Sequence, residues 1–576
     1  YRIEDAESAP MVRSLASHRR APGADVLDLV VGPLRYAESY ELAVELIGRD
    51  DTDAREQAAT IAFESRGSPF LVTELARWAV QSSRTDASQV GRVSLEAVLE
   101  SRLASLFDGA RHALELSAVS GRPVDLDVLA QAAGLADRQR DALASLRAAR
   151  MLRTGTRAGR DVAELYDDRL REVVLARMDP DRVRQAHRSL ALASEAAGVP
   201  DPEALAEHWA AAGDPERGAR FAEQAADRAA AAFAFAHAAR LYQVAIDGVL
   251  SSAAHQTLGL RLRLAEALAN AGRSADAAQA FRQAAACSTD LSQRLDLDRR
   301  AAELMLRVGQ VEQGREVLAH VLAASGMPLP SSPQQAARRA RMRRLQLSVR
   351  GLRFREVTAE LSPPNRLAAV DIAWSAASGL AMVDPVTASE YATRCLLIAL
   401  AAGEPSRVAR ALCGEAIVAA LQGPGGENRS RHALDLARDI GQRSDSLQVI
   451  GLSAIAAGIG AFLRGHWQTA REWCDRAEPI LAELCTGSDW ELAVARLIGL
   501  QASFFLGDLE PLCRRVPDLV ADADARGDAF AATALRIGLP HLAWLLRGDE
   551  DSSARHLSVA QARSSGSRAD LFQLAL

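Results

Sequence analysis

A recurring pattern of small and apolar residues after residue 201 constrains the fold of this chain more than any other feature. A small residue, in four copies a glycine, ends one helical stretch, and the next stretch carries a small or apolar residue, then an apolar one four positions further and another three positions beyond that. The first of these three residues is small enough to let two helices approach closely. The other two residues fill the groove to the following helix. The copies are Gly272 with Ala277, Phe281 and Ala284; Gly309 with Gly314, Leu318 and Val321; Gly465 with Ala470, Cys474 and Ala477; Gly548 with Ala554, Leu557 and Val559; and the triplet Ala238, Tyr242 and Ala245.

The pattern predicts helical hairpins stacked into a solenoid. Ala277 and Gly314 lie 37 positions apart, close to the ~34 residues of a tetratricopeptide repeat. The spacing drifts elsewhere, so we expect a degenerate tetratricopeptide-like array over 201–326 and a second helical-repeat region over 361–576. Three prolines within Met327–Pro333 and an arginine-rich stretch mark a connector over 327–360, and Gly423-Pro424-Gly425-Gly426 marks a second break.

The first 90 residues combine a β-like run with helices. Residues 26–31 form the run, Gly32-Pro33-Leu34 closes it, and a helical pattern follows from Ala37 to Ile47. A strand that leads into a helix indicates the last unit of an α/β domain. Gly67 and Ser68 then predict a turn, and Pro69 suits the first position of a helix.

Between residues 91 and 200 the sequence predicts short helices followed by a hairpin. Its candidate strands are Met151–Thr154 and Val162–Leu165, separated by the turn at 156–160. Helices before a small hairpin suggest a winged-helix-like module. Such a module on its own is commonly a DNA reader, but within a multidomain ATPase we favour a packing and lid element. The chain as a whole is therefore expected to be mostly α.

All 68 basic residues are arginine, and this absence of lysine limits the chemistry of the chain. A Walker A loop needs a lysine for the β/γ-phosphates, and a protein-kinase core needs one on its third strand. We therefore expect no catalytic residues in this chain. The net charge of −6 gives no global signature of nucleic-acid binding, and no run is apolar enough to span a membrane. Six isolated cysteines indicate reduced, buried thiols and a cytoplasmic protein.

Several polar groups have both a functional and a structural interpretation. The connector arginines could contact nucleic acid or phosphorylated partners, but interspersed leucines favour a solvated face of an amphipathic helix. Histidines and cysteines lack zinc spacing, and the Asp522–Gly527 stretch lacks the last ligand of a calcium loop, so we expect no metal site. His208 and Trp209 suit an apolar helical face, and the pair Asp167–Asp168 suits helix capping. The connector arginines are Arg338, Arg339, Arg341, Arg343, Arg344, Arg350, Arg353 and Arg355.

Several motifs, in order, resemble the C-terminal part of a STAND-type (signal-transduction) ATPase domain. They are Tyr1-Arg2-Ile3-Glu4-Asp5, Val31-Gly32-Pro33-Leu34, and Gly67-Ser68-Pro69-Phe70 with Glu74-Leu75. The resemblance implies that Arg2 senses the γ-phosphate of ATP and that Gly67 and Pro69 lie beside the adenine. Leu165-Tyr166-Asp167-Asp168-Arg169-Leu170-Arg171-Glu172 resembles the motif that closes the winged-helix region, with Asp167 where that motif has histidine.

A later segment resembles the C-terminal region of large bacterial serine/threonine protein kinases of the myxobacterial type. It includes residues 372–385, Arg394-Cys395-Leu396-Leu397 and the stretch 402–412. This resemblance implies a longer parent protein with an upstream kinase domain and an ATPase domain that binds ATP with Mg²⁺. The chain, which opens at Tyr1 without methionine, is accordingly expected to be its regulatory fragment, with protein or peptide partners in the helical-repeat groove. Two alternatives are the same module in a transcriptional activator with a helix-turn-helix output domain, and a scaffold without nucleotide.

Overall fold

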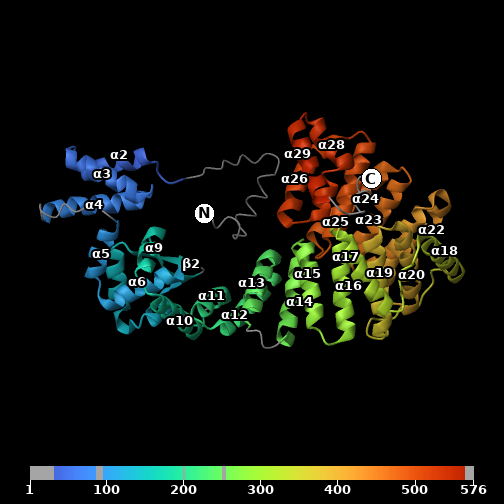
Figure 1. Cartoon of the computed structure of the whole chain (residues 1–576), viewed down its shortest axis with the longest axis horizontal. Coiled ribbons are helices and arrows are strands. Elements are labelled where there is room, and N and C mark those ends of the chain that lie inside the picture. The colour runs from blue at the N-terminus through green and yellow to red at the C-terminus, as the bar shows by residue number, and fades with distance from the viewer. Residues whose placement is uncertain (1–31, 86–94, 158, 199–200, 250–253, 565–576) are drawn as a thin grey trace. The chain divides into compact units, whose positions relative to one another are not determined.

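The computed structural model describes residues 32–85, 95–157, 159–198, 201–249 and 254–564 (Figure 1). The chain divides into two compact units, Tyr1–Val199 and Pro200–Leu576. The described residues form 28 α-helices and one three-stranded sheet, so the chain is mostly α, as its sequence predicts. The strand expected at 26–31, and with it the α/β part of the first domain, lies outside the described residues.

The first unit begins with three helices, α2 (Tyr36–Ile47), α3 (Thr52–Ser65) and α4 (Pro69–Thr85). The helix expected from Ala37 is confirmed and starts one residue earlier. Pro69 begins α4 because its fixed φ suits a first helical turn and its missing N–H costs no hydrogen bond there. Leu71, Val72 and Leu75 on α4 are buried with Ile61 of α3, which joins the helices through one apolar core.

The hairpin expected in the first unit is present and is part of a three-stranded antiparallel sheet. Strand β2 (Leu152–Arg157) pairs with β3 (Arg160–Leu165), with Leu152 opposite Leu165. A short strand, β1 (Val124–Asp125), pairs with the other edge of β3, giving the order β1-β3-β2. The helices of this region are α5 (Leu95–Ser105), α6 (Asp108–Ser120), α7 (Leu126–Ala132), α8 (Gln139–Ala148), α9 (Asp168–Ala176) and α10 (Pro180–Ala196), with the 3-10 helix η2 (Ala136–Arg138).

The second unit consists of helices stacked in sequence order, as the repeat pattern predicts. Its helices are α11 (Pro202–Ala211), α12 (Pro215–Ala231), α13 (Phe235–Gly248), α14 (Ala254–Asn270), α15 (Ser274–Cys287), α16 (Leu291–Arg307), α17 (Val311–Ala324), α18 (Pro333–Arg350), α19 (Pro364–Leu380), α20 (Pro385–Ala402), α21 (Pro405–Ala420), α22 (Glu427–Arg443), α23 (Leu447–Leu463), α24 (Trp467–Glu483), α25 (Asp489–Phe505), α26 (Glu510–Arg526), α27 (Ala529–Ala534), α28 (Gly538–Leu546) and α29 (Glu550–Ser564), with the 3-10 helix η3 (Gly423–Gly426).

Small residues set the distance between successive helices in this stack. The triplets that begin at Ala238, Ala277, Gly314 and Ala470 are buried throughout. A Cβ on Gly314 would lie 2.9 Å from Leu306 of the preceding helix, so that position has no room for a side chain. The copy predicted after Gly548 is wrong in register, because Ser553 and Ala560 face the core of α29 while Ala554 is exposed.

The second unit curves until its later helices return to its earlier ones (Figure 1). A Cβ on Gly487, before α25, would lie 3.2 Å from Oδ1 of Asn270 at the end of α14. A Cβ on Gly272 would lie 3.3 Å from Nη1 of Arg526 at the end of α26. The helices therefore complete a turn in which α25 and α26 close against the α14–α16 region.

The connector arginines are not one solvated face, so that interpretation is wrong in part. Arg344 of α18 lies 3.3 Å from the carboxylate of Glu415, which is fully buried, and Arg350 donates to the carbonyl of Leu400 at 3.1 Å. Apolar Leu345 on the same helix is instead 66% exposed. Arg343 and Arg344 of α18 turn inward because the buried carboxylates of Glu390 on α20 and Glu415 on α21 need counter-charges, whereas Arg338 and Arg341 are exposed as predicted.

Three of the six cysteines, Cys395, Cys413 and Cys474, are buried as predicted. The other three, Cys287, Cys485 and Cys513, are partly exposed. None of the helices in the described part of the chain is both long and apolar enough to cross a membrane.

Candidate functional site

The turn formed by Gly67, Ser68 and Pro69, here called the G-S-P turn, requires glycine at its first position. Gly67 has φ of +83°, and a Cβ there would lie 2.3 Å from the carbonyl oxygen of Leu34. The Leu34 N–H donates to the carbonyl of Gly67 at 2.9 Å. The Gly32-Pro33-Leu34 segment and the start of α4 are thus held together by backbone contact, which only glycine permits.

The turn also contacts the motif that follows β3. The hydroxyl of Ser68 donates to Oδ2 of Asp167 at 2.8 Å, while Oδ1 of Asp167 accepts from the backbone N–H of Arg169 at 2.9 Å. The rings of Phe70 and Tyr166 stack with centroids 5.3 Å apart. Asp167 therefore caps α9, as predicted, and in the same geometry anchors the G-S-P turn, which the sequence did not indicate.

Glu74 on α4 forms a second contact that holds elements of the first unit together. The sequence indicated no structural role for this residue. Its side chain is only 6% exposed, and it contacts Arg102 of α5 at 2.5 Å, Arg150 at 2.8 Å and Arg77 at 3.2 Å. A buried carboxylate with several guanidinium partners holds those elements in one arrangement. No local signal could have found it, because Arg102 and Arg150 are distant in sequence.

The residues expected beside a nucleotide differ in what they could do. Gly67 is buried, so it shapes the turn and has no surface to offer, whereas Pro69 is exposed and its ring could lie against a flat base. Arg2 falls outside the described residues. The placement of Gly67 and Pro69 beside an adenine and of Arg2 beside the γ-phosphate stays a prediction.

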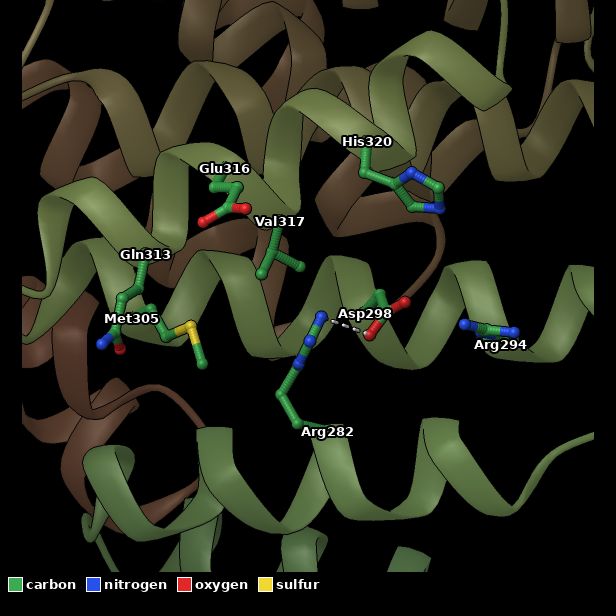
Figure 2. Close-up of a pocket in the computed structure, with 8 residues that line it drawn as sticks. All are labelled: Arg282, Arg294, Asp298, Met305, Gln313, Glu316, Val317 and His320. Carbon is green, nitrogen blue, oxygen red and sulfur yellow. Dashed lines mark hydrogen bonds and ion pairs between the residues drawn. The ribbon is translucent and has the colours of Figure 1, made fainter.

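The second unit carries a groove of about 430 Å³ across α15, α16 and α17, here called the α15–α17 groove (Figure 2). Arg282 extends from α15 toward Asp298 on α16, and the two side chains form an ion pair of 3.1 Å. Gln313 and Val317 reach into the same space from α17. Charged, polar and apolar side chains from three helices thus line the same space.

The α15–α17 groove has a mixed composition. Met305 and Val317 supply apolar surface, and Arg294, Glu316 and His320 supply polar groups around it. Protein interfaces combine an apolar centre with a polar rim in this way. The repeat pattern predicted a groove, but it did not identify these residues because they occupy positions that the pattern leaves free.

Two further residues noted in the sequence are structural. His208 and Trp209 are buried on α11, as expected, and the guanidinium of Arg217 lies 3.9 Å from the centre of the Trp209 ring. Among the described residues, no three histidine, cysteine, aspartate or glutamate side chains are grouped to hold a metal ion.

No protein-family model matches this chain, and no curated protein sequence matches it. One solved structure that is similar to it is a STAND protein with a tetratricopeptide repeat sensor from Pyrococcus horikoshii. The match covers 92% of this chain and 72% of that chain, with 13% identity and a TM-score of 0.34.

Proposed function

We propose that this chain is the regulatory and partner-binding portion of a bacterial multidomain signalling protein, and that a protein or peptide partner binds in the α15–α17 groove. The observation that carries the proposal is the groove itself. Its charged rim and apolar floor are presented by three consecutive helices, whose own packing is completed by the small residues on their other faces. Stacked helical repeats bind extended partners on such surfaces.

The parent protein in this proposal is a cytoplasmic serine/threonine kinase with a central STAND ATPase domain that binds ATP with Mg²⁺. Residues 1–90 would contribute Arg2, Gly67 and Pro69 to the nucleotide site, and residues 91–200 would form a winged-helix lid. Supporting this, the G-S-P turn is fixed to the end of β3 by the Ser68–Asp167 hydrogen bond. A change at the turn would therefore move the lid with it. The kinase and ATPase activities belong to the upstream domains.

The groove is tested by selecting linear peptides from a displayed library on the purified chain and titrating an enriched peptide by fluorescence anisotropy. Glu316→Arg should weaken that peptide by about tenfold or more, because it reverses a rim charge. Glu312→Arg is the matched control, since Glu312 is exposed on the same helix and does not line the groove. Equal affinities of the two variants would overturn the proposal.

The nucleotide link is tested separately, on the protein extended at its N-terminus by its ATPase core. Isothermal titration with ATP and Mg²⁺ should give binding heat, and replacement of Pro69 by glutamate should reduce the affinity. An extended protein that gives no heat would show a scaffold without nucleotide.

A further inference from the structure

A second cavity lies where the turn of the second unit closes, and neither the repeat pattern nor the proposed function accounts for it. This closure cavity has a volume of about 390 Å³. Its lining residues lie on α16, α19, α21, α23 and α24 and on the segment from Gly487 to the first turn of α25. The volume falls in the lower part of the range typical of small-molecule sites, about 300–1,000 Å³.

One wall of the closure cavity is centred on Glu303 of α16. The hydroxyl of Ser375 donates to Glu303 at 2.6 Å, and the guanidinium of Arg307 donates to it at 2.5 Å. Arg299 donates to the Ser375 hydroxyl at 2.7 Å. Burial opposes ionisation of Glu303, but the charges of Arg307 and Arg299 lower its pKa to about 2. The Glu303 carboxylate in this wall is therefore ionised at neutral pH.

A second group of charged side chains is centred on Asp371 of α19, the helix that also carries Ser375. Arg407 of α21 contacts its carboxylate at 2.8 Å, and Arg410 of the same helix contacts its other oxygen. The guanidinium of Arg410 also lies 5.1 Å from the centre of the Trp374 ring. Burial opposes ionisation of Asp371, but its hydrogen bond from Arg407 and the charge of Arg410 lower its pKa.

The closing wall is formed by α25 and the residue before it. Oε1 of Glu491 lies 3.6 Å from Arg307, and Arg307 lies 4.8 Å from the centre of the Trp490 ring. Arg307 therefore bonds to the first wall and to the closing wall simultaneously. A ligand held by Arg307 would contact both ends of the turn.

Four side chains of the closure cavity keep a buried polar atom without a hydrogen-bond partner among the described residues. These atoms are Nε of Arg307, Nε of Arg410, Oγ of Ser488 and Oε2 of Glu491. Ser488 is only 4% exposed. Buried polar groups are nearly always satisfied in proteins, so several in one cavity indicate a missing partner. A ligand that satisfied all four groups would accept from two guanidinium groups and donate to a carboxylate.

The net charge of the side chains that line the cavity further limits which ligands fit it. Four guanidinium groups and three carboxylates line the closure cavity, which leaves an excess of one positive charge. A nucleoside triphosphate would bring more negative charge than these walls offset. A monoanion with an ammonium group matches both the charge and the mixed donors and acceptors.

We propose that the closure cavity binds an acidic α-amino acid, whose carboxylates contact Arg307 and Arg410 and whose ammonium contacts Glu491. The ligand joins α16 and α21 to α25 and so stabilises the closed turn of the second unit. This site is separate from the α15–α17 groove, and it requires no partner protein and no nucleotide.

The proposal is tested by isothermal titration of the purified chain with L-glutamate, L-aspartate, glutarate and inorganic phosphate as separate probes. At least one of the two amino acids should bind, and about tenfold or more tightly than glutarate, which lacks the ammonium, or phosphate. Absence of heat from both amino acids, or equal binding of phosphate, would overturn the proposal. These titrations involve no peptide, so their failure would leave the groove proposal standing.

Two variants identify the site. Arg410→Gln should reduce the affinity for the amino acid at least about tenfold, because it removes a charge on the ligand carboxylate. Glu491→Gln should reduce the preference for the amino acid over glutarate, because it removes the carboxylate that contacts the ammonium group. If Arg410→Gln does not fold, Glu491→Gln alone tests the site. Arg443→Gln is the control, because Arg443 pairs with Glu356 on an exposed surface and does not line the cavity. Unchanged binding in both cavity variants would refute the assignment.

Discussion

The hydroxyl of Ser68 donates a hydrogen bond of 2.8 Å to the carboxylate of Asp167, which lies 99 positions further along the chain. This one contact connects the G-S-P turn to the N-terminus of α9. Asp167 completes the arrangement by capping α9 through the backbone N–H of Arg169. The G-S-P turn and the segment that follows β3 are therefore one structural element in the folded chain.

Replacement of Asp167 by alanine should destabilise the first unit by about 1–2 kcal/mol, because a helix cap and a side-chain hydrogen bond are lost together. Urea unfolding of Ser68→Ala, Asp167→Ala and the double variant would measure the coupling. A double variant whose loss equals the sum of the single losses would show that the two side chains act independently. Asp137→Ala, in the short η2 helix, is a control without this contact.

Replacement of Gly67 by alanine should destabilise the first unit by about 2–4 kcal/mol. A left-handed φ costs a non-glycine residue about 1–2 kcal/mol, and the added Cβ would in addition collide with the Leu34 carbonyl. Gly134→Ala separates the two costs, because Gly134 also has positive φ but has open space around its Cβ position. Differential scanning calorimetry should show the larger loss for Gly67→Ala, and similar losses would contradict the collision.

Replacement of Glu74 by glutamine should cost about 3 kcal/mol, because Arg102 and Arg150 would lose the buried carboxylate that they share. Chemical unfolding monitored by circular dichroism would measure the loss. Glu41→Gln is a suitable control, since Glu41 is exposed on α2. A loss no larger than that of the control would mean that the arginines find other partners.

The stability of the second unit should fall in acid through Glu303. Its pKa is lowered to about 2 in the folded chain, whereas an unperturbed glutamate has a pKa of about 4.3. A carboxyl with a lowered folded-state pKa stabilises the fold above its unfolded pKa, and that stabilisation is lost as the pH falls toward the folded value. The free energy of unfolding of the second unit should fall by about 2 kcal/mol between about pH 5 and pH 2.

Glu303→Gln checks this assignment. It should be less stable than the original chain at neutral pH and should lose less stability on acidification, as measured by urea unfolding at several pH values. Glu316→Gln, which changes an exposed glutamate on α17, is the control. An acid dependence in Glu303→Gln that equals that of the original chain would assign the effect to other carboxyls.

Local features of the sequence determined the elements of this fold. Pro69 fixes the start of α4, and the alternation before and after residue 159 fixes the β2–β3 hairpin. The triplet at Ala277 fixes the buried face of α15, because residues three or four positions apart share one side of a helix. These features depend on neighbours within one or two helical turns, which the sequence displays directly.

Only the tertiary structure decided which distant groups meet. The pairing of Ser68 with Asp167, the three arginines around Glu74 and the inward arginines of α18 all depend on long-range packing. The closure cavity depends on it most, since Arg307 of α16 meets Glu491 of α25 only in the folded second unit. No local pattern predicts this contact, because the sequence pattern of each hairpin reports only on its packing against neighbouring helices.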